Sequence, residues 1–268
     1  MPPPVVLTIA GSDPCGGAGI QADLKTFHQF RVYGCAVPTL ITVQNSRRVA
    51  RVDVLSADLV REQIEIVLED LPVAAVKTGA LGSAEIVRVV ARAAEGWNFP
   101  LVVDPVMLSS HGLALLPEAA VAALRDDLLP RAALITPNLP EAEALTGCPI
   151  RHEDELRRAA FRLREMGAKA VLIKGGHREG SATDVLFDGA EWHEFPAPRL
   201  TTRHTHGTGC VYSAAIAAGL ARGEALVEAV ARAKRFVHEA IRTAPGLGEG
   251  AGPLNHFVDA SAAGPLLF

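Results

Sequence analysis

Short apolar runs alternate with longer stretches of helical periodicity along most of the chain. Six runs are almost entirely apolar, as in strands buried on both faces of a parallel sheet: 5–10, 35–43, 74–77, 101–104, 133–136 and 170–174. Between them, apolar residues recur three and four positions apart, which predicts helices at 19–30, 57–71, 83–95, 117–129, 139–145 and 153–166. This alternation predicts an α/β domain with a mostly parallel central sheet and helices on both faces.

Residues 183–195 break this rhythm. Two short segments, 183–187 and 191–195, flank Asp188-Gly189, which is a typical β-hairpin turn and predicts an antiparallel pair near a sheet edge. Two further helices, at 208–221 and 225–243, and a glycine-rich loop at 246–253 complete the pattern. No linker, repeat or second core is visible, so we expect a single domain over residues 1–257. The small residues at 258–268 have no period and predict a disordered tail.

The composition limits the classes of partner. The 268 residues are 49% hydrophobic with a formal net charge of −4, so no global basic field attracts nucleic acid or an anionic membrane. Arg47, Arg48 and Arg51 form a basic stretch that we expect to be a solvated flap. No apolar stretch approaches the roughly 20 residues of a membrane helix, and four widely spaced cysteines fit reduced thiols. We therefore expect a cytoplasmic protein with a small-molecule substrate.

Polar and glycine-rich segments follow the predicted strands. In a parallel α/β sheet, ligands bind beyond the carboxyl ends of the strands, where helix N-termini also point free N–H groups. Such segments occur here at 11–13, 44–45, 77–79, 104–105, 136–138, 174–177 and 207–210. Their common position predicts a ligand site at one edge of the sheet without identifying the ligand.

The glycine-rich segment at 11–19 opens a predicted helix, so a dinucleotide site has to be considered. Its glycine spacing differs from G-x-G-x-x-G, and no acid lies between Asp23 and Asp53, where a dinucleotide site would have its ribose-binding acid. No glycine is followed by Lys-Ser or Lys-Thr, which excludes a Walker A loop. A tight turn and contact with a ligand are equally good interpretations of this segment.

Two further patterns fit either structure or phosphate chemistry. Asn138-x-x-Glu141 at a strand-to-helix junction is a capping box, but an acid in that place can also organise Mg²⁺ and its waters beside bound phosphates. Lys174 ends a buried apolar run before two glycines. It is either a solvated cation or a counter-charge for a transferred phosphate, and its setting favours the second.

The segment Gly-Thr-Gly-Cys at 207–210 is the most informative. It places bare N–H groups at the start of a small-residue helix, which can stabilise charge developing on a phosphoryl group. Cys210 lies in that first turn, where the helix dipole lowers a thiol pKa and favours a proton acceptor. The structural alternative is a packed cysteine beside a solvated pair, His204 and His206. A zinc site is disfavoured because no further ligand lies at metal spacing.

The chain resembles the hydroxymethylpyrimidine/phosphomethylpyrimidine kinase family of thiamin synthesis. The resemblance rests on collinear motifs at 10–23, 43–45, 103–107, 136–142, 174–177, 206–210 and 252–257. It implies a three-layer ribokinase-like fold, a homodimer, and an enzyme that depends on ATP and Mg²⁺. Members phosphorylate 4-amino-5-hydroxymethyl-2-methylpyrimidine and then its monophosphate, which gives the diphosphate.

The resemblance also implies roles for individual residues. Gln44 would hydrogen-bond the aminopyrimidine edge, in a pocket shared with Gly11, Ala18, Asp23 and Val106. Cys210 would be the catalytic base, beside an anion hole made of Gly207, Thr208 and Gly209. Lys174 would act in catalysis and face the nucleotide phosphates, together with Asp104, Asn138, Glu141 and Thr208. Mg²⁺ would be held indirectly, through Glu141 and Asp104.

Two departures from the family pattern leave alternatives open. Ala80 stands where the family usually has Met, which would widen the pyrimidine pocket, and Ser110-His111-Gly112 stands where Lys-Ser-Gly is common. A pyridoxal- or pyridoxine-type vitamin kinase is one alternative, because the rings are of similar size. A non-catalytic nucleotide-sensing module is another, because a fold does not fix a function. Gln44 favours the pyrimidine, and the intact 207–210 segment argues against a non-catalytic module.

Overall fold

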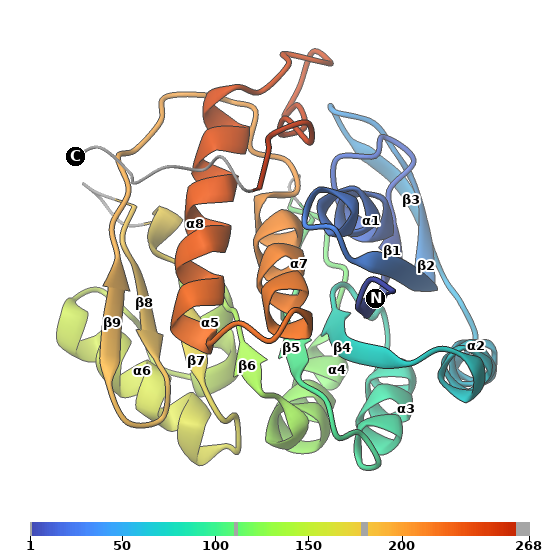
Figure 1. The fold of residues 1–268 in the computed structure, drawn as a ribbon. Helices are drawn as coiled ribbons and strands as arrows, with labels where there is room; N and C mark the ends of the chain where they lie inside the picture. The colour runs from blue at the N-terminus through green and yellow to red at the C-terminus, as the bar shows by residue number, and fades with distance from the viewer. Residues whose placement is uncertain (1, 110–111, 178–181, 261–268) are drawn as a thin grey trace.

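A mixed β-sheet forms the centre of the computed structural model, which describes residues 2–109, 112–177 and 182–260 (Figure 1). Across these ranges the strand order is β3-β2-β1-β4-β5-β6-β7-β8-β9. The parallel strands are β1 (Val5–Ser12), β2 (Tyr33–Gln44), β4 (Val73–Thr78), β5 (Leu101–Val103), β6 (Leu134–Ile135) and β7 (Val171–Ile173). The antiparallel strands are β3 (Val49–Val54), β8 (Asp184–Phe187) and β9 (Trp192–Phe195). The expected mostly parallel sheet is confirmed.

Helices cover both faces of the sheet (Figure 1). One face carries α1 (Gly19–Gln29), α7 (Thr208–Ala221) and α8 (Leu226–Arg242). The other carries α2 (Ala57–Asp70), α3 (Ala84–Ala94), α4 (Glu118–Ala123), α5 (Leu139–Thr146) and α6 (Glu153–Glu165). The helix expected at 117–129 begins as α4 and continues as a π-helical turn, Leu124–Leu128, and a 3₁₀ turn, Leu129–Arg131. The three-layer arrangement is confirmed.

Each face of the sheet packs against its own apolar layer. Along β1, Leu7 and Ile9 join the layer under α2 to α6, whereas Val6 joins the layer under α7 and α8. Successive side chains of a strand point to opposite faces, and both faces here are apolar, so the strands appear in the sequence as continuous apolar runs. Helix α7 is buried nearly all round and consists mainly of small residues, which lets it lie close to the sheet.

Strand β3 is a feature that the sequence interpretation missed. The segment expected as a flap pairs antiparallel with β2, with Leu40 opposite Val54 and Val43 opposite Arg51. Arg51 is exposed and lies 2.7 Å from Asp53 on the same strand. The arginines are therefore solvated as expected, but the backbone is an edge strand whose alternation of Val with charged residues is the signal for it.

The hairpin at 183–195 and the C-terminal segment from residue 258 were also predicted from the sequence. β8 and β9 form the expected antiparallel hairpin at a sheet edge. The first residues of the segment expected as a tail pack against the domain, because Val258 and Ala260 are buried against the layer of α7 and α8. Residues 261–268 lie outside the described ranges, as do Ser110 and His111.

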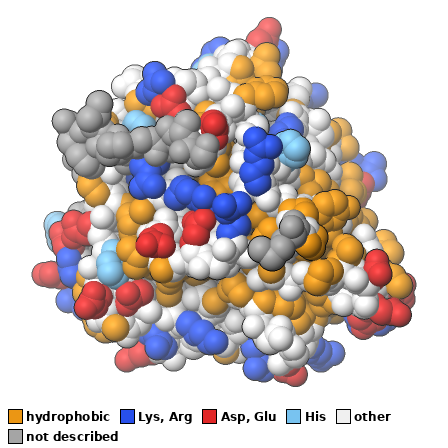
Figure 2. Space-filling view, viewed as in Figure 1, with side chains coloured by type: hydrophobic (Ala, Val, Ile, Leu, Met, Phe, Trp, Pro, Cys, Tyr) orange, Lys and Arg blue, Asp and Glu red, His pale blue; other side chains and the backbone are white. Residues whose placement is uncertain are grey.

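The surface over α1, α7 and α8 carries both signs of charge. Basic and acidic side chains lie among apolar ones on this face, and basic side chains gather mainly in its upper half (Figure 2).

Within the described ranges, none of the helices combines the length and the apolar character that a bilayer span requires.

Candidate active site

Asp104, Lys174 and Gly209 meet beyond the carboxyl ends of the central strands. Asp104 directly follows β5, Lys174 directly follows β7, and Gly209 lies in the first turn of α7. Lys174 Nζ lies 3.0 Å from Asp104 Oδ1. A Cβ added at Gly209 would lie 3.2 Å from that Nζ and 3.5 Å from Asp104 Oδ2. The lysine and the glycine-rich turn, both predicted for catalysis, therefore do come together, and the glycine leaves the space beside the ammonium open.

Asp104 is almost completely buried and is fixed by several side chains. The Ser213 hydroxyl donates to its Oδ2 at 3.3 Å, the Thr136 hydroxyl donates to its Oδ1 at 3.4 Å, and Lys174 supplies the opposite charge. A buried carboxylate requires such partners because its transfer out of water is costly. Its position beside the start of α7 is therefore well defined.

Glu141 forms the predicted capping box and also belongs to the charged cluster. Its N–H donates to Asn138 Oδ1 at 2.9 Å, and its Oε2 accepts the Asn138 N–H at 2.8 Å. The same Oε2 lies 3.9 Å from Lys174 Nζ. Burial is the main cause that raises the pKa of Glu141 to about 7, with Lys174 opposing it and Asp104 adding to it.

The two carboxylates fit Mg²⁺ held through water and phosphate. Mg²⁺ prefers oxygen ligands, keeps several waters, and is usually bound by one or two carboxylates together with substrate phosphates. Glu141 and Asp104 are both buried and acidic, and the charge of Asp104 disfavours the Glu141 carboxylate, an effect that a nearby divalent cation would oppose. Over the described ranges no cluster of three or more His, Cys, Asp or Glu side chains could hold a metal.

The start of α7 has the geometry of an anion cradle. Gly207 has φ +83°, a conformation that favours glycine, and a Cβ there would collide with the Gly17 carbonyl oxygen. Thr208 is engaged locally, because its N–H and its hydroxyl both donate to the Thr205 carbonyl, at 3.2 and 2.7 Å. The next N–H groups, of Gly209 and Cys210, belong to the first helical turn, which leaves such donors free for an anion.

Cys210 lies in this first turn as predicted, but its ionisation differs from the expectation. Burial raises the pKa of its thiol to about 11, although the charge of Lys77 opposes the rise. Asp23 and Asp104 raise the pKa further, whereas the Gly19 N–H lowers it. The expectation of a lowered thiol pKa is therefore wrong, because burial disfavours the charged thiolate. The resting group at neutral pH is a thiol.

Asp23 lies beneath the site and not in a pocket. Its side chain is completely buried on α1, where Oδ2 lies 2.8 Å from Lys77 Nζ and accepts the Thr8 hydroxyl at 2.6 Å. Asp23 has no exposed surface, so its predicted place around the substrate pocket is that of a buried residue. Sequence reasoning missed Lys77 as its partner. The available signal was a lysine inside an apolar strand of a chain with only five lysines.

Asp13 and His206 were also missed, and together they join the glycine-rich loop to the start of α7. His206 Nε2 lies 2.9 Å from Asp13 Oδ2, and His206 is buried, so the alternative of a solvated side chain does not hold for it. The N–H groups of Gly17 and Ala18 donate to the same carboxylate at 3.1 and 2.8 Å. Burial alone would raise the pKa of Asp13, but His206, the Gln44 side chain and the Cys15 N–H hold it down to about 2.

The other residues expected around the pyrimidine lie along the same edge. Gln44, at the end of β2, is half-buried and hydrogen-bonds the Asp13 carboxylate through its side chain. Gly11 is buried, and a Cβ there would lie 3.7 Å from Ala80 Cβ. Ala18 and Val106 are partly exposed. The pocket that these residues would form stays a prediction.

The depressed pKa of Asp13 leads to a stability prediction. Asp13→Asn is expected to lower the free energy of unfolding at pH 7 by about 2 kcal/mol, because the folded state holds this carboxylate well below its usual pKa. A depressed pKa stabilises the fold above about pH 4, and the effect is lost as the pH falls toward 2. Urea unfolding of both proteins between pH 7 and 3 should show a constant difference that shrinks below pH 4.

The matched control is Asp53→Asn on the exposed strand β3, which should change stability by less than about 1 kcal/mol. Equal effects of the two substitutions would contradict the role given to Asp13.

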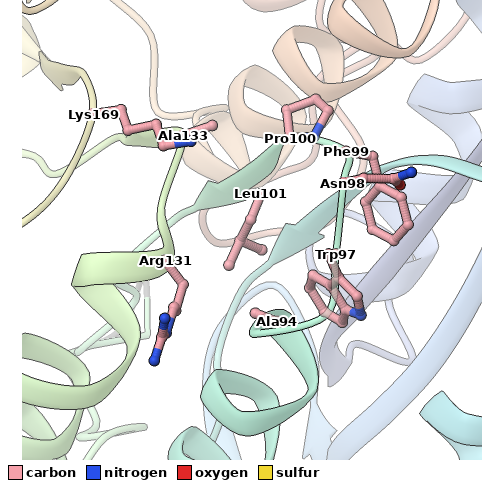
Figure 3. Close-up of a pocket in the computed structure, with 9 residues that line it drawn as sticks. All are labelled: Ala94, Trp97, Asn98, Phe99, Pro100, Leu101, Arg131, Ala133 and Lys169. Carbon is pink, nitrogen blue, oxygen red and sulfur yellow. The ribbon is translucent and has the colours of Figure 1, made fainter.

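A separate cavity of about 320 Å³ lies at the amino ends of the central strands, on the side away from the cluster around Lys174 (Figure 3). It is formed where β5, β6 and β7 begin, and its lining residues are Ala94, Trp97, Asn98, Phe99, Pro100, Leu101, Arg131, Ala133 and Lys169. None of the predicted site residues lies among them, so the cavity is not part of the cluster around Lys174.

Comparisons with known proteins fit this geometry. The model of a family described as phosphomethylpyrimidine kinase matches residues 13–255. A hydroxymethylpyrimidine/phosphomethylpyrimidine kinase from Streptomyces coelicolor is 50% identical over 254 residues, which cover 95% of this chain and 94% of the relative. A thiamine biosynthesis bifunctional protein from Geobacter sulfurreducens is also 50% identical, over 95% of this chain, and the chain spans 52% of that protein's length.

Among solved structures, the pyridoxal kinase from Staphylococcus aureus in complex with AMP-PCP is similar, with a TM-score of 0.89 and 35% sequence identity. The match covers 98% of this chain and 96% of that one.

Proposed function

Because this chain belongs to the phosphomethylpyrimidine kinase family, we propose that it transfers the γ-phosphoryl group of ATP to 4-amino-5-hydroxymethyl-2-methylpyrimidine and then to the monophosphate, in thiamin biosynthesis. The observation that carries the proposal is the meeting of Lys174, Asp104 and Gly209 at the start of α7. A cation beside free N–H groups suits a phosphoryl group in transfer, where charge must be neutralised and held in place.

In the first transfer, the hydroxymethyl oxygen attacks the γ-phosphorus, and the bond to the β–γ bridging oxygen breaks to release ADP. Lys174 and the start of α7 would face the negative charge of the transferred group. The predicted anion hole is Gly207, Thr208 and Gly209; because the Thr208 N–H donates to the Thr205 carbonyl, we assign the anion to the N–H groups of Gly209 and Cys210. The alcohol must lose its proton, and a Cys210 thiolate is the proposed acceptor. In the second transfer, the nucleophile is a phosphate with a second pKa near 6, by analogy with phosphorylated side chains. It arrives ionised and needs no base.

Mg²⁺, bound with ATP, would neutralise charge on the phosphate oxygens. Asp104 and Glu141 would hold it indirectly, which fits their buried, acidic setting. The AMP-PCP complex of the similar pyridoxal kinase supports ATP as the phosphoryl donor. The resemblance to the family further supports a cytoplasmic homodimer, with no nucleic acid or membrane partner.

Separate reactions with the alcohol, the monophosphate and pyridoxal test the proposal. ATP consumption is measured with each compound alone, with Mg²⁺ and again in excess EDTA. We expect turnover of both pyrimidines with Mg²⁺ and its loss with EDTA. Turnover of pyridoxal alone would favour the vitamin-kinase alternative, and no turnover of any alcohol would favour a nucleotide-sensing module.

The position of Gln44 leads to a binding prediction. Gln44→Ala should weaken binding of the pyrimidine by about 5- to 150-fold, because a lost hydrogen bond to a buried partner costs about 1 to 3 kcal/mol. Calorimetry with the alcohol and, separately, with an ATP analogue gives both affinities. The nucleotide affinity is the internal control and should stay nearly unchanged; equal losses for both ligands would mean that Gln44 does not belong to the substrate pocket.

A further inference from the structure

Lys77 and Asp23 form a fully buried pair of opposite charges close to Cys210. Lys77 lies on β4, Asp23 lies on α1, and neither side chain is exposed. Helix α7, which carries Cys210, packs against both of these elements. Asp23 lies four residues after Gly19 and so on the same face of α1, and the Gly19 N–H donates to the Cys210 sulfur. The fold therefore brings the pair and the thiol together from three elements.

The pair is costly for a merely structural contact. Removal of two charges from water carries a penalty, and apolar side chains of similar size often fill such a space at lower cost. The hydrogen bonding of this pair is also incomplete. Asp23 Oδ2 accepts from Lys77 and Thr8, but Asp23 Oδ1 is buried with no hydrogen-bond partner. The free-energy cost of burying this pair indicates a role beyond packing.

The charges around Cys210 act in opposite directions. Lys77 from β4 favours the thiolate, whereas Asp23 from α1 and Asp104 from the end of β5 disfavour it. Lys174, beyond β7, also interacts electrostatically with the thiol. Among the neighbouring groups, Lys77 has the largest effect on the pKa of the thiol and lowers it. Only burial has a larger effect, and burial raises this pKa.

We propose that Lys77 is a positioning residue for the first phosphoryl transfer, in which its ammonium stabilises the Cys210 thiolate while Asp23 holds that ammonium in place. The thiol first loses its proton to water. The thiolate then takes the proton of the hydroxymethyl group as the new O–P bond forms and the bond to the bridging oxygen of ATP breaks. Lys77 keeps its own proton throughout. The catalytic part of this inference rests on the proposed function, but the effect of the charges on the thiol does not.

Alkylation of the resting protein tests the charge effect directly. Removal of Lys77 alone would leave the Asp23 carboxylate buried with no cation, which is strongly destabilising. Removal of the Asp23 charge also has a cost, but the amide oxygen of Asp23→Asn can still accept a hydrogen bond from the Lys77 ammonium. The comparison therefore uses Asp23→Asn and the double variant Asp23→Asn with Lys77→Met. Labelling of each cysteine by iodoacetamide at pH 8 is followed by peptide mass spectrometry, and thermal unfolding checks that each variant is folded.

Asp23→Asn should speed labelling of Cys210 by about tenfold, and the double variant should slow it by about tenfold relative to Asp23→Asn. The thiolate is the reacting form, and one unit of pKa changes its amount tenfold. Cys15, which is exposed, is the internal control and should keep the same rate. Equal labelling of Cys210 in the two folded variants would overturn the proposal, since a packing role predicts no such difference.

Steady-state kinetics supplies the second readout. The double variant should lose kcat for the alcohol relative to Asp23→Asn, while kcat for the monophosphate stays within a fewfold. A shift in labelling with no change in the ratio of the two rates would overturn the catalytic part of the proposal. Expected labelling in a protein that phosphorylates neither pyrimidine would contradict the proposed function and leave the charge effect standing.

Discussion

Lys174→Met is expected to lower kcat for both phosphorylations by about 10³-fold. The lysine is the charge nearest to the anion cradle, with its Nζ 3.2 Å from the Cβ position of Gly209. Removal of a preorganised cation that stabilises a transferred phosphoryl group costs about 10³-fold or more in other enzymes, and both reactions transfer the same group from the same donor. Initial rates from the alcohol and from the monophosphate, at saturating ATP, measure the two losses.

The matched control for this substitution is Lys169→Met. Lys169 is exposed and lines the cavity at the amino ends of the central strands (Figure 3). It should keep both rates within about twofold, because surface substitutions far from a site have small effects. A Lys174→Met protein that is folded and retains more than a tenth of either rate would contradict the role given to Lys174.

Cys210→Ala is expected to lower kcat for the alcohol by about 10²- to 10⁴-fold, while kcat for the monophosphate falls much less. A positioned base contributes this much when the nucleophile must lose a proton, and the ionised monophosphate has no such requirement. The two rates are measured separately, each with its own purified substrate. Equal losses would mean that the cysteine packs or positions, and that the proton leaves by another route.

The raised thiol pKa adds a pH dependence to the same experiment. Because burial raises the pKa of Cys210 to about 11, the thiolate is scarce at pH 7 and increases with pH. In the wild type, kcat/KM for the alcohol should therefore rise steadily from pH 7 to 10, since this parameter reports ionisation in the free enzyme. The profile for the monophosphate should stay flat over that range, and the Cys210→Ala profile for the alcohol should lose its rise.

The layers of the fold could be predicted because they depend on local patterns. The apolar runs and the Asp188-Gly189 turn identify strands whose burial and pairing the structure confirms. Strand β3 was not predicted because two of its six residues, Arg51 and Asp53, are charged. Charged residues at such positions indicate a solvated loop as readily as an edge strand. The π-helical turn after α4, which packs against α3, has no recognised signature in its own sequence.

The site was predictable where one segment supplies the chemistry, as at the start of α7 and at the Asn138 cap. It was not predictable where partners are distant in sequence. Asp23 and Lys77 are 54 residues apart, and Asp13 and His206 are 193 apart. The pKa of Cys210 illustrates the same limit. The helix start is visible in the sequence, but the burial that raises the thiol pKa exists only once α7 packs against α1 and β4.

The central claim is that one site, built around Lys174 and Gly209, performs both transfers. Inhibition of alcohol phosphorylation by the monophosphate tests it most directly, with the rate of formation of alcohol-derived monophosphate followed by an isotopic label. The account predicts competitive inhibition against the alcohol, with an inhibition constant equal to the KM of the monophosphate as a substrate. An undiminished rate of alcohol phosphorylation in the presence of saturating monophosphate would show two separate sites and contradict the account.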